Sequence, residues 1–566
     1  MPLYNIKTKT MKTKLLIILT VLCGMSNAQT PTWNWAKSAG GNGNDYGNDI
    51  VVDAAGNSYV IGTFNDTAIF NTDTLIDKSL NGGNMFLAKY DMNGNLLWVQ
   101  QAGNPMGFYQ TVWCEGTAIS IDTSGNIYTA GSYTAKVVFG TDTLPFGNSG
   151  VFIAKYNSNG NVLWATSLSP AISVSFGNPL RDITVDINGN CYLTGFHNPW
   201  GASNPDTLTN KGISDIFLCK INNSGILQWI KSNGGTATDQ GFFIHLDTAS
   251  NIYIGGYFNS DTAYFGGITI IKNITPITAA QVPFIAKYNS SGNPQWVKQG
   301  DEYNAWYIDA ASDYIGNIYS QIPFITDTII VNSTTYISKG IGDILLTKIN
   351  SSGNVVWIKQ FGGTGDDGVE AINMDTSGNI IAYGYFQDTI ILGIDTLIAS
   401  STYDYFLVKY NSSGNIISAS ALHSGSDIIE MALDINGNAY FTSYYSGTAN
   451  FGSTNLTSVN SNWDIFVAKL SQGTLTNISD NYILKDKLLI FPNPFSSQAV
   501  LQADNLLKGA TLTVYNCFGQ TVKQIKNISG QAVTLLRDNL PSGLYFIRLT
   551  EENKIIAVDK LVISDK

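Results

Sequence analysis

Asp182-Ile-Thr-Val-Asp-Ile-Asn-Gly-Asn-Cys-Tyr-Leu-Thr-Gly-Phe196 is the stretch that decides the fold of this 566-residue chain. Apolar and polar residues alternate on both sides of Asn188-Gly-Asn190, which is the period of half-buried strands. Gly and Asn tolerate the positive φ of a tight turn, so this is one β-hairpin. A second hairpin of the same kind runs from Asp215 to Trp229. The stretch 182–229 therefore predicts four consecutive antiparallel strands.

This four-strand pattern recurs along the chain. The first-hairpin turn reads Asp-x-x-Gly-Asn, with one degenerate copy, and its copies begin at Asp53, Asp122, Asp186, Asp247, Asp313, Asp375 and Asp434. The third strand contains a lysine in each copy: Lys89, Lys155, Lys220, Lys287, Lys348, Lys409 and Lys469. The fourth strand is found only six times, five times with a tryptophan and once without, at Ile416–Ser418. Four-stranded repeats of this kind are typical of the blades of a β-propeller.

The seventh fourth strand is found at the other end of the chain. Residues 32–37, Thr-Trp-Asn-Trp-Ala-Lys, match the Trp strands of the other copies, and no such strand follows Lys469. Pairing the two ends in one sheet removes the open edge that a ring of blades would leave. We therefore predict an all-β chain with a closed seven-bladed β-propeller over residues 29–473, followed by a small antiparallel β-sandwich.

The blade pattern resembles a known bacterial repeat. It reads Asp-x-x-Gly-Asn-x-Tyr-x-x-Gly, then Asp-x-Phe-x-x-Lys-x-x-x-x-Gly-x-x-x-Trp, and is similar to the SBBP, or seven-bladed propeller, repeats over Trp33–Leu470. The resemblance implies the propeller architecture. It implies no ligand, because one fold carries unrelated activities.

Residues 1–28 have the features of an export signal. Lys12 and Lys14 precede the apolar run Leu15–Leu22, and Ser26-Asn-Ala28 is a small-x-Ala cleavage site. A lipid-anchored alternative at Cys23 is disfavoured, because the preceding Leu22 is large for such a site. The run is too short to span a bilayer, and we expect no transmembrane segment after signal removal.

Composition excludes one class of partner. Charged residues are 13% of the chain and the net charge is −11. Phosphate binding needs clustered Lys and Arg, so we expect no nucleic acid. Cys191 and Cys219 fall on neighbouring predicted strands, where two buried free thiols are favoured over a disulfide.

The two faces of the predicted propeller differ. Both kinds of short turn lie on one face, and the long connections, where function usually resides, lie on the other. Two connections between blades read Gly-Gly-x-Gly-x-Asp, at 40–45 and 362–367, and a third, at 234–239, has alanine in place of the third glycine. Such stretches resemble the start of a calcium-binding nonapeptide, which works only in tandem copies. We expect plain interblade crossovers and no cofactor, with calcium as the alternative; the turn aspartates are predicted to cap their own turns.

A short motif in the loops resembles a bacterial O-glycosylation acceptor. It reads Asp-Thr followed by Ala, Leu or Ile. The alternative interpretation, with equal weight, is that the motif is simply a turn in a decayed repeat. The threonines are Thr67, Thr74, Thr143, Thr207, Thr262, Thr328, Thr389 and Thr396.

Catalytic motifs give little support to an enzyme. The three histidines, His197, His245 and His423, have no metal-ligand spacing, and no nucleophile elbow or phosphate loop occurs. A glycosidase with acids from different blades would escape such a search. The repeated tryptophans are predicted to pack blade against blade rather than to bind a ligand.

The C-terminal residues follow a different pattern. Residues 474–486 are predicted to be a linker, and residues 487–566 a small β domain. This domain resembles the type A C-terminal sorting domain of the type IX secretion system, through motifs that include Pro492, Asn493, Pro494, Gly519, Gly543 and Tyr545. The resemblance implies that the type IX secretion machinery is a partner and that the chain reaches the cell surface or the medium.

These features together predict a secreted or cell-surface protein. Its expected role is non-catalytic recognition or adhesion, with a glycan, a protein or a surface as the ligand. The alternative is an extracellular hydrolase acting on polysaccharide.

Overall fold

The computed structural model describes residues 31–565 apart from several short segments. Those segments are 80–81, 105–111, 145–149, 170–171, 173–178, 199–207, 209–210, 273–280, 301–308, 325–327, 332, 394, 423–429, 472–487, 517–520 and 552–553. The chain divides into two compact parts, a repeat region that ends at Gly473 and a C-terminal region that begins at Thr474. Within the described residues the structure is all-β, apart from one 3-10 turn, η1 (Val459–Ser461).

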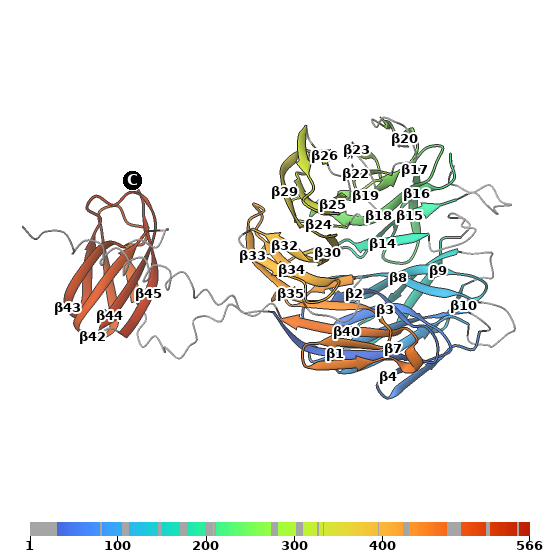
Figure 1. The fold of residues 1–566 in the computed structure, drawn as a ribbon, viewed down its shortest axis with the longest axis horizontal. Helices are drawn as coiled ribbons and strands as arrows, with labels where there is room; N and C mark the ends of the chain where they lie inside the picture. The colour runs from blue at the N-terminus through green and yellow to red at the C-terminus, as the bar shows by residue number, and fades with distance from the viewer. Residues whose placement is uncertain are drawn as a thin grey trace, which may run out of the picture. The chain divides into compact units, whose positions relative to one another are not determined.

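The repeat region contains successive four-stranded antiparallel units, numbered here as sheets 1 to 7 (Figure 1). Sheet 1 contains β2 (Tyr46–Val52), β3 (Ser58–Phe64), β6 (Asn84–Tyr90) and β7 (Leu96–Ala102). Sheet 2 contains β8 (Cys114–Ile121), β9 (Ile127–Tyr133), β12 (Gly150–Tyr156) and β13 (Val162–Ser167). Sheet 3 contains β14 (Leu180–Val185), β15 (Cys191–His197), β16 (Asp215–Ile221) and β17 (Leu227–Asn233).

The remaining sheets repeat this order. Sheet 4 contains β18 (Asp239–Leu246), β19 (Ile252–Phe258), β22 (Val282–Tyr288) and β23 (Pro294–Gln299). Sheet 5 contains β24 (Ala310–Ser312), β25 (Ile318–Phe324), β28 (Asp343–Ile349) and β29 (Val355–Gly363). Sheet 6 contains β30 (Gly368–Met374), β31 (Ile380–Phe386), β34 (Asp404–Tyr410) and β35 (Ile416–Leu422), and sheet 7 contains β36 (Glu430–Leu433), β37 (Ala439–Tyr445), β40 (Asp464–Ser471) and β1 (Thr32–Gly41).

The first strands of these sheets meet at the middle of the repeat region, which is a propeller-like arrangement (Figure 1). They contact one another in the order β2, β8, β14, β18, β24, β30 and β36, and β36 in turn contacts β2. The N-terminal strand β1 pairs antiparallel with β40, with Trp35 opposite Lys469. The first strand of the chain therefore lies in the same sheet as the last strands of the repeat region.

Short hairpins follow the second strand of most sheets, and these account for the long repeat. They are β4 (Thr67–Phe70) with β5 (Asp73–Ile76), β10 (Val137–Phe139) with β11 (Asp142–Leu144), β20 (Thr262–Phe265) with β21 (Ile268–Ile271), β26 (Thr328–Val331) with β27 (Thr334–Ile337), β32 (Thr389–Leu392) with β33 (Asp395–Ile398), and β38 (Thr448–Phe451) with β39 (Thr454–Thr457). In sheet 3 the corresponding residues lie outside those that the structure describes.

The C-terminal region is a separate antiparallel β unit with its own apolar core. It contains β41 (Leu488–Phe491), β42 (Gln498–Tyr515), β43 (Thr521–Leu536), β44 (Gly543–Glu551) and β45 (Lys554–Ile563). The strand order is β41-β42-β44-β45, and β43 also pairs with β42. The long β42 pairs with β41 through its first half and with β44 through its second half, so it joins both ends of the unit.

Candidate functional site

The short turns after the first strands are capped by their aspartates. At Asp53, Oδ1 accepts hydrogen bonds from the backbone N–H groups of Ala55 and Asn57, both at 2.9 Å. Oδ2 accepts from the Asn57 amide at 2.7 Å and from the Tyr59 hydroxyl at 3.1 Å. The backbone and amide bonds recur at Asp122, Asp186, Asp247, Asp313, Asp375 and Asp434. These bonds occupy both oxygens, so the turn-cap interpretation is confirmed.

The repeated tryptophans lie between neighbouring sheets. The Trp98 indole N–H donates to the Ser158 carbonyl, in a short turn of the next sheet, at 3.3 Å, and Lys89 donates to the same oxygen at 3.2 Å. A Cβ on Gly160 of that turn would lie 3.0 Å from the Trp98 ring, so the ring packs directly on the turn. Four other indoles make the equivalent bond: Trp35, Trp164, Trp296 and Trp357. Their predicted packing role is confirmed.

A row of carboxylates links the first strands to one another. Asp49, Asp182 and Asp309 lie four residues before the turn aspartates of sheets 1, 3 and 5. Each accepts the N–H of the residue after it and a second N–H from the next sheet. The second bonds come from Ile119, Ile244 and Ile372, at 2.8, 2.7 and 2.9 Å. The same position in sheets 2, 4 and 6 holds Ala118, Phe243 and Ala371, so the acids bridge alternate pairs of sheets.

Sheet 7 breaks this alternation. Glu430 occupies the equivalent position there, and its neighbour, sheet 1, already carries Asp49. The Ile50 N–H, which Glu430 would need for an equivalent bridge, donates to Asp49 at 2.7 Å. Burial and then the charge of Asp49 raise the pKa of Glu430 well above its usual value, while burial raises the pKa of Asp182 to about 7 and that of Asp309 to about 6. This cluster can therefore hold protons near neutral pH.

The long connections between sheets are anchored by pairs of buried aspartates. Asp45, Asp239 and Asp367 each accept a backbone N–H from a glycine four residues earlier, at 2.9, 2.7 and 2.6 Å. Each lies close to the aspartate that begins a third strand, and these partners are Asp464, Asp215 and Asp343. Among the described residues, no group of three or more His, Cys, Asp or Glu side chains is arranged to hold a metal ion. Plain crossovers without a cofactor stay a prediction, and calcium stays the untested alternative.

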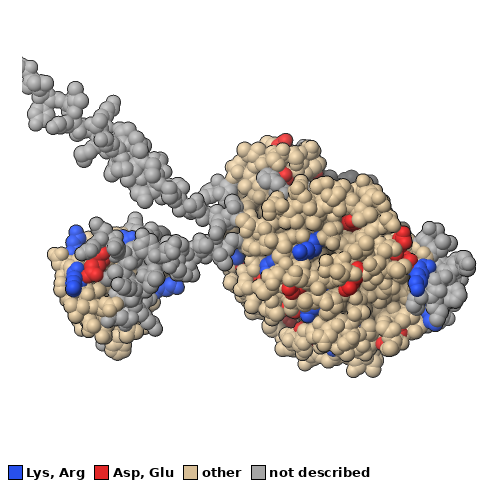
Figure 2. Space-filling model, turned by 90° about the horizontal axis from the view of Figure 1, so that it is seen from below, with Lys and Arg blue, Asp and Glu red and all other residues tan. Residues whose placement is uncertain are grey.

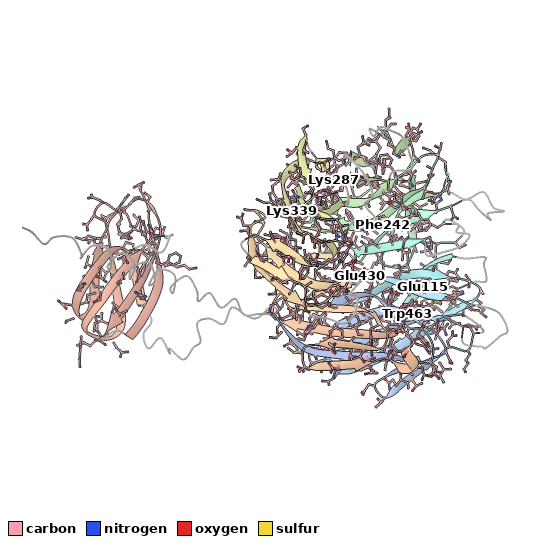
Figure 3. All side chains as sticks on the ribbon, viewed as in Figure 1. Glu115, Phe242, Lys287, Lys339, Glu430 and Trp463 are labelled. Carbon is pink, nitrogen blue, oxygen red and sulfur yellow. The ribbon has the colours of Figure 1, made fainter. Side chains whose placement is uncertain are left out.

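Three aromatic residues meet on the side of the long connections, and we call Tyr46, Tyr444 and Trp463 the aromatic cluster. Trp463 lies 5.0 Å from Tyr444 and 5.5 Å from Tyr46, between ring centroids. Its side chain is 41% exposed, although it stands directly before a buried strand. Figure 3 labels Trp463 together with Glu115, whose charge acts on Tyr46. The sequence gives no local signal for this cluster, because its members are far apart along the chain.

The candidate glycosylation threonines that the structure describes all lie on the short hairpins. Thr67, Thr262 and Thr389 begin a first hairpin strand and are half-buried, and Thr328 does the same and is exposed. Thr74, Thr143 and Thr396 lie on the second hairpin strands and are exposed. Thr207 lies outside the described residues. These positions are reachable by a modifying enzyme, and their modification stays a prediction.

The sorting-motif residues have structural roles in the C-terminal region. The Asn493 side chain donates to the Lys560 carbonyl at 3.0 Å and accepts the Val562 N–H at 2.8 Å, which ties the Pro-Asn-Pro turn to β45. Pro492 and Pro494 flank it and are exposed. Gly543 begins β44, and the nearby Tyr545 hydroxyl donates to the Pro541 carbonyl at 2.8 Å. Gly519 lies outside the described residues.

The described cysteines and histidines are buried in the packing of the sheets. Cys114, Cys191 and Cys219 are free thiols, as the favoured interpretation of the last two predicts. His197 shares a hydrogen bond with Ser232, and burial lowers the pKa of His197 to about 4. His245 bonds to the Ala310 carbonyl of the next sheet. His423 and Cys517 lie outside the described residues.

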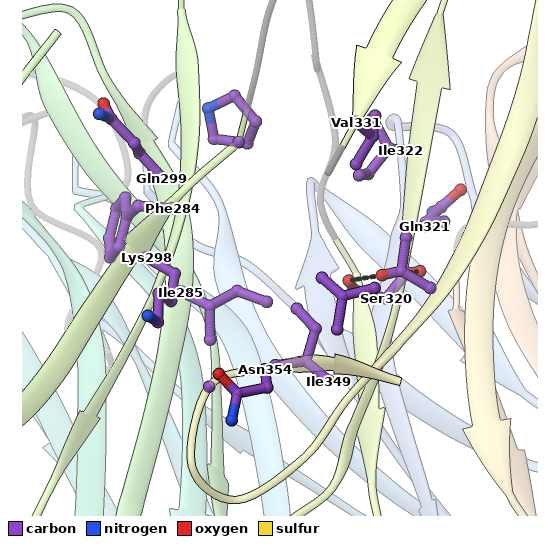
Figure 4. A pocket seen from close by; sticks show the side chains of 15 residues that line it. Phe284, Ile285, Lys298, Gln299, Ser320, Gln321, Ile322, Val331, Ile349 and Asn354 are labelled. Atoms are coloured by element: carbon purple, nitrogen blue, oxygen red, sulfur yellow. Dashed lines mark hydrogen bonds between the residues drawn. The ribbon is translucent and has the colours of Figure 1, made fainter. Parts of the chain in front are cut away.

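A cavity of about 360 Å³ lies between sheets 4 and 5 (Figure 4). Its wall contains Ile285, Ile322, Ile349 and a pair of hydroxyls, those of Ser320 and Thr347, 2.9 Å apart. The other six sheets place a phenylalanine at the third residue of the third strand, and sheet 5 has Leu345 there; the phenylalanines are Phe86, Phe152, Phe217, Phe284, Phe406 and Phe466. Leu345 itself is not among the residues that line the cavity.

Charge is spread thinly over the repeat region. On the face shown in Figure 2, basic and acidic residues stand singly rather than in a patch. Within the described residues, the structure has no helix with the length and apolar character needed to cross a membrane.

Comparison with known proteins finds distant similarities that extend over much of the chain. The uncharacterized WD repeat-containing protein L264 of Acanthamoeba polyphaga mimivirus is 24% identical over 478 residues, which are 68% of this chain and 34% of that protein. The chain thus spans about a third of the length of this curated relative.

Three solved structures are also only distantly similar to this chain, in sequence and in fold. U3-55K is 8% identical with a TM-score of 0.41, over 77% of this chain and 99% of its own. PorZ, an essential surface component of the type IX secretion system of Porphyromonas gingivalis, is 10% identical with a TM-score of 0.21, over 94% and 100%. A puromycin hydrolase is 10% identical with a TM-score of 0.38, over 84% and 62%.

The C-terminal region matches a family directly. The model of the secretion system C-terminal sorting domain matches residues 489–564, which include β42 to β45 and all six sorting-motif residues. Such a domain implies interaction with the secretion machinery. Residues 489–564 are therefore a type IX secretion system C-terminal sorting domain, and this domain directs the chain to the cell surface or the extracellular space.

Proposed function

We propose that residues 29–473 form a closed seven-bladed β-propeller of the SBBP type, between a signal peptide (1–28) and a linker (474–486) that precedes the sorting domain (487–566). Two observations support closure. The first strands contact one another from β2 to β36 and back to β2. The pairing of β1 with β40 also covers the edge that the last sheet would otherwise expose.

We infer that this propeller is a non-catalytic recognition or adhesion module that binds a glycan, a protein or a surface. The observation that carries the proposal is the aromatic cluster, which exposes a large aromatic ring on the side of the long connections. The turn aspartates of the opposite side are occupied by bonds within their own turns. Binding residues concentrate on loops that a rigid scaffold holds in place, and the long-connection face provides such loops.

A binding screen tests this function. The secreted chain, labelled with a fluorophore, is applied to a glycan array and to whole bacterial cells, and the same glycans are analysed for cleavage products. We expect saturable binding with no product. Release of new reducing ends would contradict a non-catalytic role, and the absence of binding to every glycan, cell surface and extracellular protein tested would contradict recognition.

The second candidate is an extracellular hydrolase acting on polysaccharide. The observation in its favour is that the carboxyl groups of Glu430 and Asp49 are buried and act on one another, because glycoside hydrolysis uses a pair of carboxyl groups of which one is protonated; burial raises the pKa of both groups well above its usual value. Replacing Glu430 with Gln removes the raised-pKa acid and keeps the size of the side chain. Under this candidate, any measured polysaccharide cleavage would be lost in that variant, and cleavage that persists would exclude Glu430 as the acid.

A further inference from the structure

We propose that Trp463, flanked by Tyr46 and Tyr444, is a stacking platform for a neutral sugar ring of an extended polysaccharide. This inference rests on the proposed recognition function and names its ligand class and its central residue. Trp463 lies directly before β40, Tyr444 near the end of β37 and Tyr46 at the start of β2. Three strands from two sheets therefore bring the cluster together.

The platform is held in place by its backbone and by its neighbours. The Trp463 carbonyl accepts the Asp45 N–H at 2.7 Å, and the Trp463 N–H donates to the Asn44 side chain at 3.3 Å. Tyr46 meets the indole edge-on at 74°, while Tyr444 lies at a shallower 31°. Fixing the ring before the ligand arrives lowers the entropy that binding must remove.

Comparison among the sheets shows that the fold does not require an aromatic residue here. The residue before the third strand is Gly83 in sheet 1, Ser214 in sheet 3 and Gly342 in sheet 5. Each of these positions gives the same backbone hydrogen bond to the following crossover as Trp463 does. The large ring in sheet 7 is thus unnecessary for the crossover, and 41% of its surface is exposed to solvent.

Similar rings stand over the neighbouring sheets. Tyr403 occupies the equivalent position in sheet 6, is 46% exposed, and pairs with Tyr385 at 5.9 Å. On the other side, Trp113 is 42% exposed and bridges to Gly83, the equivalent position in sheet 1. Exposed rings thus follow one another over sheets 6, 7 and 1. Such a row matches an extended chain of sugar units better than a single small ligand.

The chemistry around Trp463 selects a neutral sugar. The C–H face of a pyranose packs on an aromatic ring, and its hydroxyl groups need polar partners at the edge. Amide groups supply these partners, since the two loops beside the ring contain Asn42, Asn460 and Asn462. The Asn460 side chain donates a hydrogen bond to the Asn42 side chain, and the Asn462 side chain donates one to the Asn42 carbonyl. The carboxyl groups that act on Tyr46 are those of Asp45 and Glu115. An acidic polysaccharide would be repelled by these groups.

The test uses the secreted chain, its Trp463→Ala and Trp463→Phe variants, and a panel of neutral and acidic polysaccharides. Tyr314 is the matched control, because it is 69% exposed and lies in a short turn, on the face opposite to the long connections. We expect Trp463→Ala to weaken binding of a neutral polysaccharide tenfold or more, Trp463→Phe to retain most of it, and Tyr314→Ala to bind like the parent. Saturating polysaccharide should also shift the tryptophan emission of the parent and not that of Trp463→Ala.

Each other outcome decides against the platform. If the parent binds a neutral polysaccharide and a folded Trp463→Ala binds it equally well, the platform is wrong and the recognition function stands. If the parent binds only acidic glycans or a protein, the ligand class is wrong and the function again stands. If the parent binds no glycan, cell surface or protein, both proposals fail. Thermal unfolding within about 1 °C of the parent identifies a folded variant.

Discussion

Replacing Trp164 with Ala should destabilise the repeat region and leave ligand binding intact. Trp164 donates its indole N–H to the Asn223 carbonyl at 3.0 Å, and a Cβ on Gly225 would lie 2.9 Å from the ring. The ring also meets Tyr128 edge-on, with centroids 6.3 Å apart. The substitution therefore opens a gap between sheets 2 and 3 and leaves a carbonyl without its donor.

The magnitude follows from burial. Truncating a fully buried tryptophan costs about 3–5 kcal/mol. Trp164 is only half-buried, so we take about half of this value, and loss of a typical hydrogen bond adds about 0.5–1.5 kcal/mol, for a total of about 2–4 kcal/mol. An unfolding entropy of roughly 2.1 cal/mol/K per residue over about 440 residues converts this into a fall in Tm of about 2–4 °C.

Calorimetry and urea unfolding of the secreted chain measure this effect, with Trp463→Ala as the control. Trp463 lacks an indole hydrogen bond among the described contacts and is more exposed, so its removal should lower Tm by less than the removal of Trp164 does. A Trp164→Ala variant that melts like the parent, or that loses ligand binding while it remains folded, would refute the structural role of the repeated tryptophans.

Three further outcomes are expected. Deleting residues 32–37 should lower Tm, because β40 loses its partner and exposes an edge, and an unchanged Tm would argue against the role of β1 in closing the ring. The folded-state pKa values of Asp182 and Asp309 are about 7 and about 6, above their usual 3.8, so the folded state binds more protons than the unfolded state. The contribution of these groups to stability is therefore lost as pH rises from about 4 to 7, and Tm should be higher at pH 5 than at pH 8. Asp182→Asn should flatten this slope, and a rise in Tm towards pH 8 would contradict the assignment. Removing residues 474–566 should leave a folded repeat region in the periplasm, and normal appearance of the truncated chain outside the cell, by immunoblotting of fractions, would contradict the sorting role.

The local structure of the repeat could be predicted from its turns. Asp-x-x-Gly-Asn specifies both the positive φ at glycine, 80° at Gly56, and the acceptor that caps the turn, so the hairpins follow from short-range chemistry. The packing role of the tryptophans also followed, because an identical residue in nearly every copy is explained by a contact that every copy makes.

The candidate site could not be predicted in this way. Tyr46 and Trp463 are separated by nearly the whole repeat region. They meet only because β1 pairs with β40 in the last sheet and β2 packs against that sheet. The signal that could have revealed it is a departure from the repeat, a tryptophan where most other copies have glycine or serine. The alternating acids at Asp49, Asp182 and Asp309 were visible at a constant distance from the turn, but their bonds join different sheets and depend on the order of the sheets.

Hydrogen–deuterium exchange of the secreted chain, with and without the polysaccharide that binds most strongly, tests recognition through the long-connection face most directly. We predict slower exchange on binding in peptides that contain residues 42–46 and 459–463, and unchanged exchange in the short turns at 53–57 and 313–317. Protection confined to the short turns, with none around Trp463, would contradict the account.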